Sequence, residues 1–279
     1  MGITVLLGVL CAISWGLPDV PLARATRAIG IVPTVIGSVA IGLAVTSPIL
    51  LFTDGLPTIT GRGALLVVGM GVLTLLGYLT GFSAFQRGKV TIVAPIIACE
   101  GAVAAVFAIL LGEDVDRTVL LILPIAVVGV VLAAMGANED GGSSGVLRAI
   151  IAAVVWGGIL LMAAPVADEV GVIWGFVLVR LVALAIALPI GLYLGCATKG
   201  RLEWRNVAMW GIGDSCASLL YVAAANRGPV AVAGVLAAQF ATVGVIAAMI
   251  FLGERLRPRQ WVGIVLVIAA VTAIAGLGG

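Results

Sequence analysis

Apolar runs of about twenty residues recur from one end of this chain to the other, and few architectures accommodate such a pattern. A bilayer core about 30 Å thick needs about 20 predominantly apolar residues for each crossing helix. Of the 279 residues, 62% are hydrophobic and 10% are charged, whereas soluble domains are roughly 45 to 50% apolar and about 25% charged. The sequence therefore predicts an integral membrane protein with no separate soluble domain.

Charges, prolines and glycines divide the apolar runs into ten predicted spans. The runs are about twice as long as membrane barrel strands and lack their alternation, so helices are the spanning form that satisfies the backbone. The predicted fold class is an all-α integral membrane protein. With ends placed to about three residues, the spans are roughly 3–21, 29–52, 63–85, 90–111, 118–136, 147–165, 172–195, 205–225, 229–252 and 259–277.

A polar segment, GANEDGGSSG at residues 136–145, divides the predicted spans into five and five. The two halves share motifs in the same order. Trp15-Gly16 matches Trp156-Gly157, FSAFQRGKV (82–90) matches VAAANRGPV (222–230), and ILLGE (109–113) matches IFLGE (250–254). We therefore predict two five-helix repeats, residues 1–137 and 147–279, joined by a flexible linker at 138–146.

An odd number of helices in each repeat has a geometric consequence. The second repeat must enter the membrane from the side opposite to the first, so the two repeats are expected to be inverted. Inverted repeats recur in secondary transporters, which bind substrate near the midplane between the repeats. Glu100 lies near the midpoint of the fourth predicted span, and Gln239, its expected pseudo-symmetric partner, near that of the ninth.

A family resemblance rests on the paired Trp-Gly motifs, on a third helix of small residues and a Tyr that runs into a short turn, and on FLGERLRPRQWVGIVLVIAAV at residues 251–271. With these features the chain resembles the ten-helix EamA-type members of the drug/metabolite transporter superfamily over nearly its whole length. The resemblance implies an exporter or facilitator of amino acids, metabolites, nucleotide precursors or toxic compounds, without a bound cofactor. It also implies a multi-pass protein of the cell inner (plasma) membrane.

Glu100 is the sharpest candidate site residue, because an ionisable group at mid-bilayer costs about 2.5 to 3.5 kcal/mol on insertion scales. We expect its side chain to point inward, to a cavity or a partner. Burial favours the neutral acid, so Glu100 can bind and release a proton as the cavity alternates between wet and closed. The alternative is a protonated Glu that hydrogen-bonds a neighbouring helix as a packing contact.

Asp214, in WGIGDSCASLLY, lies about ten residues into the eighth predicted span, or about 15 Å at the helical rise. It is a candidate second proton site or a contact for a substrate ammonium group; the alternative is a partner for a buried Arg. GIGD also matches the GxGD motif of intramembrane aspartyl proteases, which need a second membrane Asp. Only Asp19 is a candidate for that role, and the Tyr-Asp pattern of those proteases is absent.

Arg180 lies about eight residues into the seventh predicted span, so we favour an interpretation in which its charged head snorkels to the interface. The alternative is a pair with Asp214 or a bidentate contact with the carboxylate of an amino-acid-like substrate. Aromatic residues are candidates for lining a cavity and stacking on a substrate, although interfacial girdles are their commoner use. The four candidates are Trp15, Trp156, Tyr78 and Tyr221.

Several classes of function are disfavoured by what the sequence lacks. It contains no His, no cysteine pair with CxxC spacing, and no Walker, nucleophile-elbow or zincin motif. We therefore expect no metal, no cofactor and no enzymatic activity. The formal charge of +2, without a basic stretch interleaved with aromatics, argues against nucleic acid as a partner.

Basic residues indicate an orientation that conflicts with the resemblance. Eleven of the fifteen Lys and Arg residues flank loops that follow odd-numbered spans, and the positive-inside rule then places both termini outside the cytoplasm. The resembling family usually has both termini in the cytoplasm. The sequence leaves the orientation open, along with the direction of transport and the oligomeric state.

These observations lead to one hypothesis and to alternatives of other classes. The hypothesis is a secondary transporter, with export of small amphipathic metabolites such as amino acids, that rocks one repeat against the other in the lipid bilayer. Substrate, and protons in a coupled cycle, would bind between spans 3, 4, 8 and 9 near Glu100, Asp214 and Gln239. The alternative is a non-transporting scaffold or assembly subunit whose midplane polar residues pair off, and an intramembrane protease is a remote third.

Overall fold

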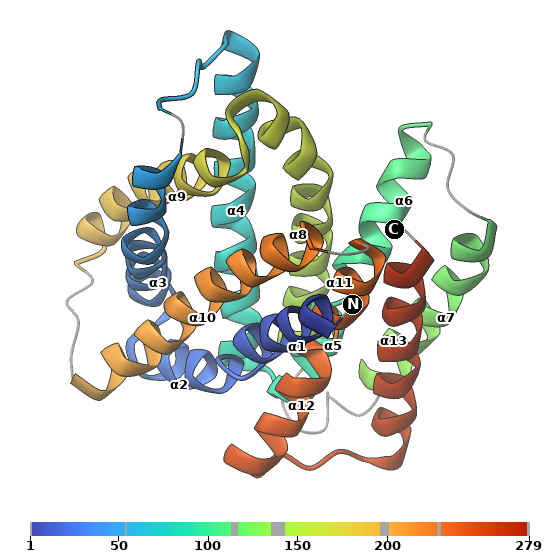
Figure 1. The fold of residues 1–279 in the computed structure, drawn as a ribbon. Coiled ribbons are helices and arrows are strands. Elements are labelled where there is room, and N and C mark those ends of the chain that lie inside the picture. The colour runs from blue at the N-terminus through green and yellow to red at the C-terminus, as the bar shows by residue number, and fades with distance from the viewer. Residues whose placement is uncertain are drawn as a thin grey trace.

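The computed structural model describes residues 2–53, 55–112, 117–134, 143–195, 201–227 and 230–277. All regular elements in these ranges are helices (Figure 1), as the sequence predicted. Along the chain they are α1 (Gly2–Gly16), α2 (Asp19–Ile29), α3 (Ile31–Thr46), the 3-10 helix η1 (Ser47–Phe52), α4 (Gly61–Arg87), α5 (Val90–Ile97), α6 (Glu100–Leu110), α7 (Arg117–Ala134), α8 (Ser143–Val170), α9 (Val172–Tyr193), α10 (Arg201–Ala225), α11 (Val230–Ala237), α12 (Phe240–Phe251) and α13 (Pro258–Leu277).

Eight helical spans in the described ranges are long and apolar enough to cross a bilayer, and two shorter apolar helices, Leu121–Ala133 and Pro258–Ala273, accompany them. The first span runs through α1 and α2 to Ile29, well beyond the predicted end near residue 21. That prediction was wrong because Arg24 and Arg27 resemble loop residues in the sequence. In the structure their guanidinium groups bind carbonyls at the ends of other helices.

Two spans are interrupted near their middle, where the sequence predicted continuous helices. Residues 98–99 separate α5 from α6, and residues 238–239 separate α11 from α12. Pro95 lies inside α5 just before the first break, whereas α11 and α12 contain no proline. Cys99 and Ala238 pack in one apolar cluster, so the two breaks lie close together.

The internal repeat is visible in the backbone as well as in the sequence motifs. Among the described residues, φ is positive only at six glycines, and glycine adopts this conformation without the strain that a side chain would add. The six form three pairs 140 or 141 residues apart, each member close to a helix end: Gly30 with Gly171, Gly55 with Gly195, and Gly112 with Gly253. The turns therefore repeat with the same offset as the motifs.

The two halves of the chain interlock. α1 packs against α10, α8 packs against α4, and α7 packs against α13 (Figure 1). A Cβ on Gly157 would lie 2.9 Å from the carbonyl oxygen of Glu100, and a Cβ on Gly16 would overlap the carbonyl oxygen of Phe240. Glycine in each Trp-Gly motif therefore allows the first helix of one half to touch the broken helix of the other.

Two arginines of α2 form hydrogen bonds with the ends of other helices at one end of the bundle. Arg24 donates to the carbonyl oxygen of Phe251 at 2.9 Å, and Arg27 donates to the carbonyl oxygen of Gly88 at 2.8 Å. These carbonyls lie at the C-termini of α12 and α4, where the helix leaves acceptors unpaired and cations are favoured. The pair of contacts joins α2 to both repeats.

Glu254 closes the same end of the bundle from the loop after α12. Its carboxylate accepts the backbone N–H groups of Val90 at 3.0 Å and Thr91 at 2.8 Å, together with the Thr91 hydroxyl at 2.8 Å. These N–H groups belong to the first turn of α5, which has no partner for them within the helix. Glu254, the acid of the second Leu-Gly-Glu motif, thus links the repeats by capping a helix.

We expect Glu254→Ala to destabilise the folded protein by about 1 to 3 kcal/mol, since charged hydrogen bonds to two backbone donors are lost. Glu254→Gln keeps one acceptor oxygen and should lose less. The measurement is the unfolding temperature in detergent, followed by tryptophan fluorescence. Arg255→Ala, an exposed neighbour, is the control, and equal unfolding temperatures for Glu254→Ala and this control would contradict the capping role.

Candidate functional site

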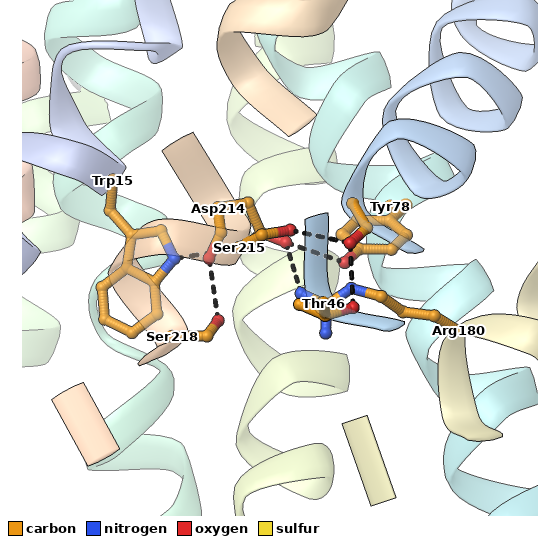
Figure 2. A network of polar contacts seen from close by, with 8 residues as sticks. Trp15, Thr46, Tyr78, Arg180, Asp214, Ser215 and Ser218 are labelled. Carbon is orange, nitrogen blue, oxygen red and sulfur yellow. Dashed lines mark hydrogen bonds and ion pairs between the residues drawn. The ribbon is translucent and has the colours of Figure 1, made fainter. Parts of the chain in front are cut away.

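The carboxylate of Asp214 in α10 is bound by side chains from three other helices (Figure 2). Oδ2 accepts a hydrogen bond from Nη2 of Arg180 at 2.7 Å and one from the hydroxyl of Tyr78 at 3.3 Å. Oδ1 accepts one from the indole Nε1 of Trp15 at 3.2 Å. Because α1 and α4 belong to the first half and α9 and α10 to the second, this cluster lies between the halves.

Arg180 forms a buried ion pair, so the predicted snorkelling to the interface is wrong and the alternative, a pair with Asp214, is confirmed. Its side chain is 6% exposed and that of Asp214 is 15% exposed. The guanidinium also lies 5.3 Å from the centroid of Phe176, within cation–π range. A Cβ on Gly42 of α3 would come within 2.9 Å of Ser215 Oγ, so this glycine allows α3 to approach α10 beside Asp214.

An aromatic cluster surrounds the ion pair on the α4 side. Tyr78 is buried and makes edge contacts with Trp156 at 5.3 Å and with Trp210 at 5.5 Å between centroids. Phe82 contacts Trp210 at 4.7 Å. Trp156 therefore joins the cluster through Tyr78, inside the bundle and not in an interfacial girdle.

Tyr221, seven residues after Asp214 in α10, belongs to a second apolar group. It packs with Trp15 in an apolar group around Cys11, between α1 and α10. Ser215 and Ser218, which follow Asp214 in α10, bind backbone carbonyls: Ser218 donates to the carbonyl of Asp214 at 2.8 Å, and Ser215 to that of Gly42 at 3.4 Å. Tyr221 and Trp15 are half-buried.

Gln239 does not point to the Asp214 cluster. Its Nε2 donates to the Thr272 hydroxyl of α13 at 2.6 Å, and its Oε1 accepts from the Thr242 hydroxyl at 3.0 Å. When the two helix breaks are superimposed by position, Gln239 corresponds to Cys99. The partner expected from the sequence was the next residue, Glu100. The structure thus places this amide in a contact between α12 and α13.

Glu100 is the first residue of α6 and is half-buried. Within the described part of the chain, its carboxylate has no hydrogen-bond or ion-pair partner. The backbone of Glu100 lies against Gly157, directly after Trp156 in α8. Glu100 is therefore a neighbour of the aromatic cluster, although it does not contact Asp214.

Asp19 and Asp214, the two acids of the protease alternative, have separate surroundings in the described ranges. No hydrogen bond joins Asp19 to Asp214, although a catalytic aspartate pair must share a proton. No group of three or more His, Cys, Asp or Glu residues in the same ranges could hold a metal ion.

From the sequence, Trp210 was given no role, and Asp19 was considered only as a second acid for the protease alternative. Trp210 forms part of the aromatic cluster, and it stands in the segment WGIGD that drew attention only through Asp214. Asp19 is 6% exposed, in the middle of the first long span. Its place near the predicted end of the first span hid its burial.

Comparison with known proteins gives a family match. The model of the EamA-like transporter family matches residues 2–135 and again residues 143–276. A solved structure titled "Crystal structure of protein" has the same fold, with a TM-score of 0.64 and 19% identity over 98% of this chain and 96% of its own. No curated protein is significantly similar. The two matches cover nearly the whole chain, and the protein belongs to the EamA-like transporter family.

Proposed function

We propose that the protein is a secondary transporter of the drug/metabolite kind, with ten spans in two inverted five-helix repeats. The observation that carries this proposal is the buried pair of Arg180 and Asp214 between the halves, within an aromatic cluster. Residues 1–137 and 147–279 would be the two repeats, and the membrane would be the cell inner membrane. Export is the proposed direction, on the strength of the family alone.

A zwitterionic amino acid, or a similar amphipathic metabolite, is the proposed substrate. Arg180 offers a bidentate donor for a carboxylate, and Asp214 offers an acceptor for an ammonium group. Trp15, Tyr78 and Trp156 offer apolar faces for the remainder of such a ligand. Tyr221 extends this surface, and Gln239 acts only if α12 and α13 separate.

The cost of the ion pair supports a binding role. Removing two charges from water costs more than their attraction returns unless the geometry is good, and apolar residues often stabilise a protein better. A chain that needed only packing would therefore gain little from Arg180 and Asp214. A ligand that carries both charges, however, can exchange with the internal pair.

Proton coupling is proposed at Glu100 and, in second place, at Asp214. Glu100 is half-buried and without a described partner, so a proton can reach and leave its carboxylate. Asp214 already has a cationic partner at 2.7 Å, so a proton would compete with Arg180 for the same oxygen. Protonation of Asp214 would accordingly require that the ion pair open.

Neutralising the ion pair separates its structural role from its binding role. We expect Arg180→Gln and Asp214→Asn each to destabilise the protein by about 3 to 5 kcal/mol, because each leaves one buried charge unpaired. The double variant restores much of this stability but should transport no amino acid in proteoliposomes. Wild-type flux in the double variant would overturn the assignment of the site.

Glu100→Gln tests the coupling proposal. We expect amino-acid flux to persist in proteoliposomes but to lose its response to an imposed pH gradient, because an amide cannot exchange a proton. Glu203→Gln, a half-buried acid near the start of α10, is the matched control and should respond as the wild type does. A wild-type response in both Glu100→Gln and Asp214→Asn would remove the proposal.

The scaffold alternative has specific support, since Asp214 and Gln239 are both satisfied by protein partners. It predicts no flux of any amino acid and no change in unfolding temperature when amino acids are added. Ligand binding to the folded state raises the unfolding temperature by mass action. A screen of amino acids against the purified wild-type protein therefore distinguishes the two classes.

A further inference from the structure

Asp19 is a second buried acid, and the proposed substrate site does not use it. It begins α2 directly after the break that ends α1, and it is 6% exposed. Its Oδ2 has no hydrogen-bond partner among the described residues. The N-cap position of α2 is occupied by Pro18, which makes no side-chain capping bond.

The surroundings of Asp19 come from both halves of the chain. A Cβ on Gly244 of α12 would lie 3.1 Å from Oδ2 and 3.4 Å from Ala94 of α5, so all three residues meet at one point. Trp210 of α10 interacts with the carboxyl group through its indole. Glycine at position 244 allows the carboxyl group to lie against the backbone of α12.

Among the residues that the structure describes, no charged side chain balances Asp19. The helices α3, α5 and α12 contain no titratable residue. On α2 itself, Arg24 and Arg27 bind carbonyls at the ends of α12 and α4. On α10, Asp214 is paired with Arg180, and on α4 Tyr78 donates to Asp214. The other charged residues of these two helices are Arg62 and Arg87 at the ends of α4, and Arg201, Glu203 and Arg205 at the start of α10.

An ionised carboxylate without a counter-ion or a full set of donors is costly in such surroundings. We propose that Asp19 is a proton-binding site, which holds a proton in this conformation and releases it to water when α2 separates from α12. The proposal rests on the proposed function, because it needs the two halves to move relative to each other. On release the proton leaves a carboxyl oxygen for water, and on closure the carboxylate takes one back.

A short chain of contacts joins Asp19 to the substrate site. Trp210 interacts with Asp19 and makes edge contacts with Tyr78 and Phe82. Tyr78 in turn donates to Asp214. A displacement of Trp210 would therefore move Tyr78, which donates a hydrogen bond to Asp214. The proton on Asp19 can in this way favour one arrangement of the substrate site.

Infrared spectroscopy of the full-length protein in lipid nanodiscs tests the proton directly. A protonated carboxylic acid has a carbonyl stretch that a carboxylate lacks, and isotope-labelled aspartate shifts the stretch of Asp but not of Glu. We expect the wild type at neutral pH to show an acid band that shifts with labelled aspartate. We expect Asp19→Asn to lose this band and Glu100→Gln to retain it.

Absence of the aspartate band in the wild type, or its persistence in Asp19→Asn, would overturn the proposal. If Asp19→Asn does not fold, Asp19→Glu replaces it, and the band must then shift with labelled glutamate instead. The spectra need no substrate, so a protein that transports nothing can still show the band. Failure of the proposed function is thereby distinguished from failure of the proton site.

Discussion

The ion pair of Arg180 and Asp214 is the interaction on which the centre of this protein depends. Each charge is tolerable between the helices only because the other is 2.7 Å away and because Trp15 and Tyr78 supply further donors. These partners fix the rotation of α1, α4, α9 and α10 about their axes. Apolar contacts alone cannot specify this arrangement, because lipid tails offer the helices equally apolar surroundings. The polar contact therefore sets the arrangement of the four helices.

Small residues allow the helices to approach one another closely. Helices in a membrane associate through packing and hydrogen bonds, since no hydrophobic difference drives them together. Gly42 allows α3 to approach Ser215 of α10, while Gly16 and Gly157 bring α1 and α8 against the breaks at Phe240 and Glu100. The Trp-Gly motif thus combines a ring for the central cluster with a contact to the opposite half.

The sequence was sufficient for the class of fold, the twofold repeat and the family, because hydropathy and motif spacing are local properties. The breaks at 98–99 and 238–239 could not be predicted, since only the first lies near a proline. The orientation of the Arg180 side chain was predicted wrongly. Its position along the seventh span does not reveal that Asp214, on the next helix, α10, is close enough to pair with it. The burial of Asp19 depends on Gly244 in α12, far away in the sequence.

Two aspartates in similar surroundings are left in different chemical situations by their neighbours. Asp214 has a cation and two neutral donors, so its oxygens suit an exchange between internal and external charges. Asp19 has one indole and an unpartnered oxygen, so its carboxyl group suits an exchange of a neutral and an ionised form. Trp210 and Tyr78 form one chain of contacts between them, so a change at one acid can reach the other through these rings. Coupling between a proton and a substrate needs no more than such a shared element with two arrangements.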